Sequence, residues 1–350
     1  MPSDRIYLDH AATTPLLPAA REAMLAGFAD WANPSSPHAQ GRRARAALED
    51  ARARIANALG WTGEVVFTSG ASEALTLALT RSRLPLAAVS SVEHEAALRH
   101  AEAAPKLAVD TGGLVDPAST ALGGLVAVQQ INNETGVIQP LDEIVAEVRG
   151  AGGLLLADCA QGAGKMALPD TDLIALSAHK FGGPIGVGAL LVRDWAMLRP
   201  SGGQERGYRA GTENLPGVLA MAAALEESGA WLANAAVQRQ RLELSVQAAG
   251  GEVVAGGSPR IPTIGAYRMP GKSAAAQLIR FDGMGIAVSA GSACSSGSLR
   301  TSHVLGAMGM PDKAASEVIR VSIGRETTEA EIASFVAAWS EVAGKASAAA

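Results

Sequence analysis

Short, wholly apolar segments alternate with helical patterns over the first two thirds of this chain. Apolar segments without polar alternation are typical of parallel strands that are buried on both faces. We therefore expect an α/β fold with a mostly parallel sheet that is covered by helices on both sides. The expected strands are residues 64–67, 86–90, 125–129, 154–157, 173–176 and 187–192, and the helices between them are about 72–81, 93–104 and 141–149.

The pattern changes after Thr212, where two long Ala-rich helical segments begin. They cover residues 215–227 and 231–248 and lead into a smaller α+β region with expected strands near 263–267, 286–289 and 318–323 and a closing helix from about 329. This change predicts two domains, which suits a chain of 350 residues. The large domain comprises residues 12–230, and the small domain comprises residues 1–11 and 231–350.

Composition excludes several classes of protein. Charged residues make up 18% of the chain and apolar residues 48%, which is typical of a compact soluble enzyme. The net charge is -5 without a long basic run, so nucleic-acid binding is not expected. No signal-peptide pattern and no apolar run long enough to span a membrane is present. Cys159 and Cys294 are expected to be free thiols, which favours a cytoplasmic location.

Lys180 follows an apolar strand directly, within Ser177-Ala-His-Lys180. Ligands of open α/β sheets bind outside the carboxyl ends of the strands. A lysine at such a place is costly to bury unless it is solvated, paired or used covalently. Desolvation lowers the pKa of an amine, and a neutral lysine can form a Schiff base. Taken alone, Lys180 is more simply explained as a surface residue at a strand end.

Other strand ends add polar groups to the same edge of the expected sheet. His94, Asn133 and Asp158 each follow a strand, and the turn before Ser72 leaves the first N–H groups of a helix free for a phosphate. Each signal alone has an ordinary structural explanation, such as a helix cap or a polar turn. Together with Lys180 they match the needs of pyridoxal phosphate: an amine for its aldehyde, an anion at its ring nitrogen, a phosphate cup and a group over its ring.

The sequence resembles the cysteine desulfurase family of class V aminotransferases, which are pyridoxal phosphate enzymes of fold type I. One matching segment is Tyr7-Leu-Asp-His-Ala-Ala-Thr-Thr-Pro15 near the start of the chain. The resemblance implies a large domain with a mostly parallel seven-stranded sheet flanked by helices and a smaller α+β domain. The other matching segments, in family order, are residues 33–36, 67–73, 93–94, 132–136, 158–161, 177–180, 206–212, 289–297 and 319–324.

The resemblance implies a role for each matching polar residue. Lys180 would form the internal aldimine, His94 would stack on the ring and move protons, and Asp158 would pair with the ring nitrogen. Arg320 would clamp the substrate carboxylate, a bidentate task that suits a guanidinium. Thr212 of a partner subunit would complete the phosphate cup, which implies a homodimer. The further cofactor contacts fall on Ala71, Ser72, Asn133, Gln161, Ser177 and His179, and the further substrate contacts on Asn33 and Asn133; no metal is implied.

Cys294 is the predicted nucleophile. Its surroundings, Ser289-Ala-Gly-Ser-Ala-Cys-Ser-Ser-Gly-Ser298, are small and polar, unlike the apolar site of a structural cysteine. A thiol near His94 or a cation can reach the reactive thiolate form. Cys159, at a buried strand end, is expected to serve packing instead. The predicted reaction converts L-cysteine to L-alanine and leaves a persulfide on Cys294, whose sulfur passes to an acceptor protein or a small thiol, for iron–sulfur clusters or other sulfur biosynthesis.

Alternatives remain open at this point. A selenocysteine lyase, or a class V aminotransferase or epimerase, would use the same scaffold, and a non-catalytic sulfur-relay or regulatory subunit could retain the fold. Two departures from the family also bear on function. Ser72 stands where many relatives have threonine, and the chain ends soon after the helix near residue 340. Relatives that supply iron–sulfur scaffolds often carry a longer C-terminal extension, so docking of such a scaffold is in doubt.

Overall fold

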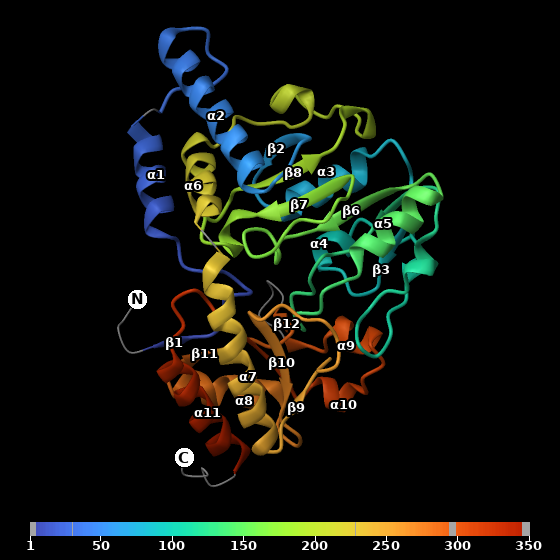
Figure 1. The fold of residues 1–350 in the computed structure, drawn as a ribbon, viewed down its shortest axis with the longest axis vertical. Helices are drawn as coiled ribbons and strands as arrows, with labels where there is room; N and C mark the ends of the chain where they lie inside the picture. Colours follow the sequence, from blue (N-terminus) through green and yellow to red (C-terminus); the bar gives the residue numbers. More distant parts are fainter. Residues whose placement is uncertain (1–4, 30, 228, 294–298, 345–350) are drawn as a thin grey trace.

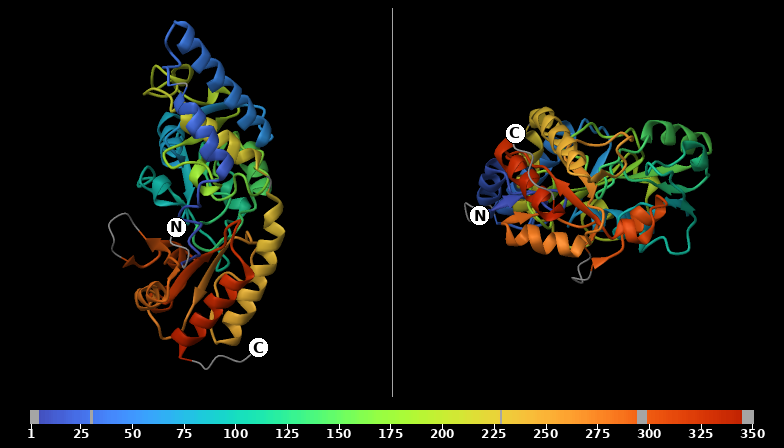
Figure 2. Two further views of the ribbon diagram at one scale, coloured as in Figure 1. Left: turned by 90° about the vertical axis from the view of Figure 1, so that its left-hand side faces the viewer. Right: turned by 90° about the horizontal axis from the view of Figure 1, so that it is seen from below.

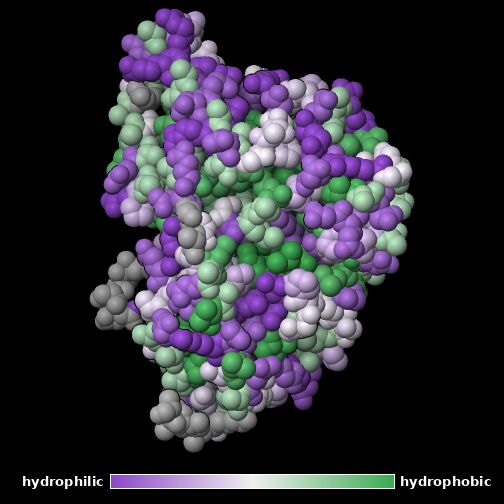
Figure 3. All heavy atoms as spheres, viewed as in Figure 1, coloured by the Kyte–Doolittle hydropathy of each residue, from purple (hydrophilic) through white to green (hydrophobic). Residues whose placement is uncertain are grey.

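The computed structural model describes residues 5–29, 31–227, 229–293 and 299–344. These residues form two lobes, and Figure 1 shows the larger lobe above the smaller one. The face in Figure 3 mixes hydrophilic and hydrophobic residues, with hydrophobic ones visible at the waist between the lobes. No helix of the described ranges is both long enough and apolar enough to cross a membrane.

The larger lobe is built on a seven-stranded sheet. Its strands are, in spatial order, β2 (Glu64–Thr68), β8 (Gly188–Val192), β7 (Leu173–Ser177), β6 (Leu154–Asp158), β5 (Leu125–Ala127), β3 (Leu86–Ser90) and β4 (Lys106–Leu107). Strands β7, β6, β5, β3 and β4 are parallel, and β8 is antiparallel to both β2 and β7. The predicted α/β fold with a mostly parallel seven-stranded sheet is confirmed.

Both faces of this sheet are buried, which explains why its strands are apolar throughout. In β6, Leu155 and Ala157 belong to a core that the strands share with α1, α2, α5 and α6. Leu156, between them, belongs to a second core on the other face, with α3 and α4. The helices are α1 (Pro18–Ala29), α2 (Ala39–Ala58), α5 (Leu141–Gly150) and α6 (Leu215–Glu226) on the first face, and α3 (Ala71–Arg81) and α4 (Glu95–Leu98) on the second.

The smaller lobe has its own core around a three-stranded antiparallel sheet of order β14-β10-β9, formed by β14 (Val318–Ser322), β10 (Ile264–Arg268) and β9 (Glu252–Val253). Leu8, far away in sequence, packs in that core with the stacked rings of Phe281 and Phe335. Figure 2 shows α7 (Leu232–Ala248) and α11 (Glu329–Ala343) side by side along this lobe. Two further pairs of strands are β1 (Ile6–Tyr7) with β11 (Ile286–Ala287) and β12 (Ser292–Ala293) with β13 (Leu299–Arg300). The other α-helices of the described residues are α8 (Ala274–Gly283), α9 (His303–Ala307) and α10 (Asp312–Ala315).

Three expected elements are shorter than predicted. The helix expected over 93–104 is the single turn α4, because the chain turns before Pro105 and then pairs with β3 as β4. Proline disfavours helical geometry in the residue before it. Strand β5 ends at Ala127, and the N–H of Gln129 donates to the Glu93 carboxylate at 2.7 Å. The strand expected over 286–289 is β11, which has two residues.

Candidate active site

Polar side chains gather where neighbouring strands of the large sheet end. Asp158 is the last residue of β6, and the adjacent strand β7 leads directly into the 3-10 turn η2 (Ala178–Lys180). His94 follows β3 and caps α4. Because β3, β6 and β7 are parallel, their carboxyl ends lie at one edge of the sheet. The structure thus brings together three of the residues that the sequence singles out.

Lys180 is half-buried, and its Nζ donates to the backbone oxygens of Ala11 at 2.6 Å and Ala12 at 2.9 Å. Burial and the nearby Arg320 guanidinium lower the pKa of Lys180 to about 8, although the carboxylate of Asp158 acts in the opposite direction. A substantial fraction of such an amine is neutral near physiological pH. Lys180 is therefore able both to attack an aldehyde and to accept a proton.

Asp158 is buried, and its Oδ1 accepts a hydrogen bond from the N–H of Ala160 at 2.9 Å. Burial raises the pKa of this carboxyl group, while His94 and Lys180 partly offset the effect by their charge. A buried carboxylate of this kind gains from any further cation or N–H donor. The protonated ring nitrogen of pyridoxal phosphate is such a donor.

His94 is exposed, and its Nδ1 accepts a hydrogen bond from the N–H of Ala96 at 3.1 Å. That bond leaves Nε2 to carry the proton of the neutral ring. Desolvation lowers the pKa of His94, and the negative charge of Asp158 raises it in part. The imidazole is thus held neutral at the edge of the site with a ring face free to stack.

The start of α3 offers an anion site. Gly70 precedes the helix with a φ of 143°, and no side chain among the described residues caps its first N–H groups. Ser72 lies in the first turn and is exposed, and Ser177 Oγ lies 3.5 Å from the point where a Cβ on residue 70 would stand. Glu73, in the same turn, forms an ion pair with Arg209 at 2.9 Å, which neutralises its charge. Free N–H groups at a helix start suit a phosphate, as expected for Ala71 and Ser72.

Gln161 and His179 contact the N-terminal segment. Gln161 Nε2 donates to the oxygen of Ala11 at 2.9 Å, and its Oε1 is buried without a partner among the described residues. His179 Nδ1 lies 3.1 Å from Thr13 Oγ1, and burial lowers the pKa of His179 to about 4. The orphaned Gln161 oxygen is open to a ligand group beside Lys180, such as the ring hydroxyl of pyridoxal phosphate.

The smaller lobe contributes Arg320, on β14, to the site. Its Nη1 donates to the backbone oxygen of Asn133 at 3.0 Å, and its Nη2 pairs with Asp9 Oδ1 at 2.7 Å. Its Nε is buried and has no partner among the described residues. The positive charge of Arg320 lowers the pKa of Lys180. An incoming carboxylate could bind this guanidinium in the place that Asp9 occupies.

Three predicted site residues are not brought into this cluster. Asn33 is exposed, and its Oδ1 accepts from the N–H of Ser35 at 2.8 Å, a local turn contact. Thr212 is exposed on the loop before α6. Cys294 lies outside the described residues, between the paired strands β12 and β13. The roles of all three stay predictions.

The structure adds two charged residues that the sequence analysis did not select. Asp9 follows β1, so the strand-end argument that found Asp158 could also have found it. Lys165 carries no comparable signal, since it lies in a turn after Gln161. Among the described residues, no group of three or more His, Cys, Asp or Glu side chains is arranged to hold a metal ion.

A model of the class-V aminotransferase family matches residues 6–335. The chain belongs to this family. It is 39% identical to a cysteine desulfurase of Klebsiella pneumoniae, with 95% of this chain and 91% of the relative covered, and 37% identical to one of Cereibacter sphaeroides, with 94% and 93% covered. Its fold is similar to that of a NifS-like protein from Rickettsia africae ESF-5, with a TM-score of 0.88, 30% identity and coverage of 97% and 99%. The predicted membership of the cysteine desulfurase family of class V aminotransferases is confirmed.

Proposed function

We propose that this chain is a pyridoxal phosphate-dependent cysteine desulfurase. One observation carries the proposal: Lys180, with a lowered pKa, lies beside a buried carboxylate, Asp158, at the ends of adjacent parallel strands. The relatives that are cysteine desulfurases support L-cysteine as the substrate. The alternative activities, on selenocysteine or as an aminotransferase, have no specific observation in their favour.

The residues present fit pyridoxal phosphate. The free N–H groups of Ala71 and Ser72 would hold its phosphate together with Ser177 and His179, and the orphaned Gln161 oxygen would meet its ring hydroxyl. Asp158 would pair with the ring nitrogen, and His94 would stack on the ring. When bound, the cofactor supplies an aldehyde for the amine of Lys180 and of the substrate, and a ring that withdraws electrons from the substrate Cα.

Other side chains would bind the substrate and transfer protons. Arg320, with Asn133 beside it and with assistance from Asn33, would bind the substrate carboxylate. The neutral amine of Lys180 would take the proton from the substrate Cα, and His94, held neutral, would relay protons at the edge of the site.

Cys294 is the proposed nucleophile. Its thiolate would attack the substrate sulfur, forming a sulfur–sulfur bond while the carbon–sulfur bond breaks. The electron pair of that bond stays on the substrate carbon, which takes up a proton and leaves as L-alanine. Cys159 is excluded from this role because it is fully buried in the core of the large sheet, where burial raises the pKa of its thiol well above the ordinary value.

A homodimer is part of the proposal, because Thr212 of the partner would complete the phosphate cup. Exposed hydrophobic residues on one side of the large lobe support it: Leu25 and Phe28 on α1, and Trp31 just beyond it, are 60%, 57% and 83% exposed. Large exposed apolar side chains that lie together are typical of protein interfaces. We also propose two domains, residues 12–230 and residues 1–11 with 231–350, a division that the separate hydrophobic cores support. The proposed location is cytoplasmic, and the proposed sulfur acceptor is a protein or a small thiol.

The test compares two single-cysteine variants in the cofactor-loaded protein. Cys294→Ser is expected to keep the visible absorbance of the cofactor and to lose sulfide release and alanine formation from L-cysteine. Cys159→Ala, the matched control, is expected to keep both. Full turnover in Cys294→Ser would refute the nucleophile, and faster alanine formation from L-selenocysteine than from L-cysteine would favour the lyase. Following alanine with and without a candidate acceptor protein tests the transfer step.

A further inference from the structure

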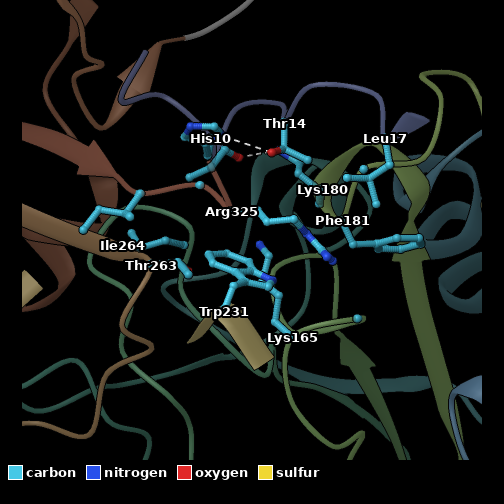
Figure 4. A pocket seen from close by; sticks show the side chains of 15 residues that line it. His10, Thr14, Leu17, Lys165, Lys180, Phe181, Trp231, Thr263, Ile264 and Arg325 are labelled. Atoms are coloured by element: carbon cyan, nitrogen blue, oxygen red, sulfur yellow. Dashed lines mark hydrogen bonds between the residues drawn. The ribbon is translucent and has the colours of Figure 1, made fainter. Parts of the chain in front are cut away.

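A small cavity lies beside Lys180 between the two lobes. Its volume is about 30 Å³, enough for one or two water molecules or a single small ion. Figure 4 shows the side chains of Lys165, Lys180, Trp231 and Arg325 around it. His94, Asp158 and Arg320 do not line this space, so Lys180 is the one proposed cofactor contact among its described lining residues.

Two hydrogen-bond donors that line the cavity lack an acceptor. The side chain of Lys165 makes no hydrogen bond or ion pair with any described residue, and Thr263 Oγ1 is buried without a partner in the same ranges. Lys180 and Arg325 add further donors, and the described lining contains no Asp or Glu. Water could satisfy either donor, but a set of donors and cations without a carboxylate is chemically complementary to an anion.

The charges around Lys165 also favour the binding of an anion. Burial and the positive charge of Lys180 lower the pKa of Lys165 to about 7. None of the described residues that line the cavity is acidic. His10 and His179 are neutral, each with a pKa lowered to about 4, and Glu331 acts on His10. Arg325 pairs with Glu227 at 3.4 Å, which takes up the charge of that carboxylate. Lys165 is half-buried, and an amine in this setting gains from a counter-ion.

We propose that this cavity binds a small, spherical, monovalent anion, held by Lys165 and Thr263 beside Lys180. Chloride and hydrosulfide both have this size and charge. The bound anion holds Lys165 in its protonated form and forms a neutral ion pair with it next to Lys180. A space of this volume favours a small anion over a tetrahedral one such as sulfate.

The test is chloride-35 line broadening by NMR on the cofactor-loaded protein. Saturable broadening is expected in the unmodified chain, and bromide and hydrosulfide should each displace the chloride whereas sulfate should not. Binding requires protonated Lys165, so the affinity should fall about tenfold between one pH unit below and one above the pKa of that residue. The affinities of chloride and hydrosulfide decide which of the two occupies the site.

Three variants locate the binding. Lys165→Met should abolish the saturable broadening, and Thr263→Val, which removes only a hydroxyl, should weaken it about tenfold. Lys272→Met removes an exposed lysine and serves as the matched control, with unchanged binding expected. The proposal is overturned if the unmodified chain shows no saturable broadening, if sulfate competes as well as bromide, or if Lys165→Met retains the binding. Should Lys165→Met not fold, full affinity in Thr263→Val overturns it equally.

Discussion

The lowered pKa of Lys180 predicts how fast the cofactor-free protein captures pyridoxal phosphate. Only the neutral amine attacks the aldehyde. At pH 7 an amine with the ordinary lysine pKa of 10.5 is neutral in roughly 0.03% of molecules, whereas a pKa of about 8 leaves roughly 9% neutral. The structure therefore predicts capture at pH 7 that is about 300-fold faster than an ordinary lysine would allow.

Two variants of one ion pair should shift this pKa in opposite directions. Arg320 lowers the pKa of Lys180 and Asp9 raises it, although the two side chains are bonded at 2.7 Å. Arg320→Gln removes the cation and leaves Asp9 uncompensated, so the pKa should rise. Asp9→Asn leaves the cation uncompensated, so the pKa should fall. Each shift is expected to be about half a unit to one unit for charges at this range.

The assay is stopped-flow measurement of the visible absorbance that develops when the aldehyde bonds to Lys180, between pH 7 and 10.5. The phosphate, with a second pKa of about 6, stays fully ionised over this range. The logarithm of the rate should rise with unit slope and level off near pH 8 in the unmodified chain. A midpoint near 10.5 would refute the electrostatic argument. Shifts of the same sign in both variants would show that the pair acts by holding the shape of the site.

Four further substitutions, one of them a control, test other parts of the structure. Lys180→Ala should lose the visible cofactor absorbance and alanine formation together, as absorbance and turnover measurements will show; an unchanged spectrum contradicts the proposed function. Gly70→Ala forces an alanine to a φ of 143° and should cost about 1–3 kcal/mol and weaken cofactor retention, measured by calorimetry and dialysis. Glu205→Gln breaks the buried bidentate pair with Arg52, and calorimetry should show that the free energy of unfolding falls by about 3 kcal/mol. The control, Glu226→Gln, breaks the exposed pair with Arg54 and should cost at most about 1 kcal/mol. Equal losses in the two variants would contradict the role of burial.

The large sheet was predictable because each strand of its interior is apolar on both faces. Leu155 and Leu156 point to opposite cores, so no polar residue interrupts the strand, and the pattern is visible without any knowledge of the partners. The placement of Asp158 and Lys180 follows from the same regularity, because carboxyl ends of parallel strands meet at one edge. The helix near His94 is shorter than predicted for a different reason. Its apolar residues suit a helix, but Pro105 and the pairing of β4 with β3 decide the outcome.

Contacts between the lobes could not be predicted from local patterns. Arg320 and Asn133 are separated by 187 residues, and Lys180 and Ala11 by 169. Neither periodicity nor turn chemistry specifies such pairs, because they depend on how two independently packed cores meet. The cavity beside Lys165 belongs to the same class of feature.

The segment from Asp9 to Thr14 explains why these long-range contacts matter for the chemistry. Ala11 is held to the smaller lobe, because its N–H donates to Ser322 Oγ at 2.9 Å, and its oxygen accepts from Lys180 and Gln161 of the larger lobe. The N–H of Thr14 donates to the backbone oxygen of His179 at 3.0 Å. Asp9, in the same segment, binds the guanidinium that is proposed to recognise the substrate carboxylate. A displacement of one lobe relative to the other therefore changes the hydrogen bond of the reactive amine to Ala11 together with the bond of Arg320 to the Asn133 oxygen of the larger lobe. Substrate recognition and proton transfer are thus coupled through the contact between the lobes.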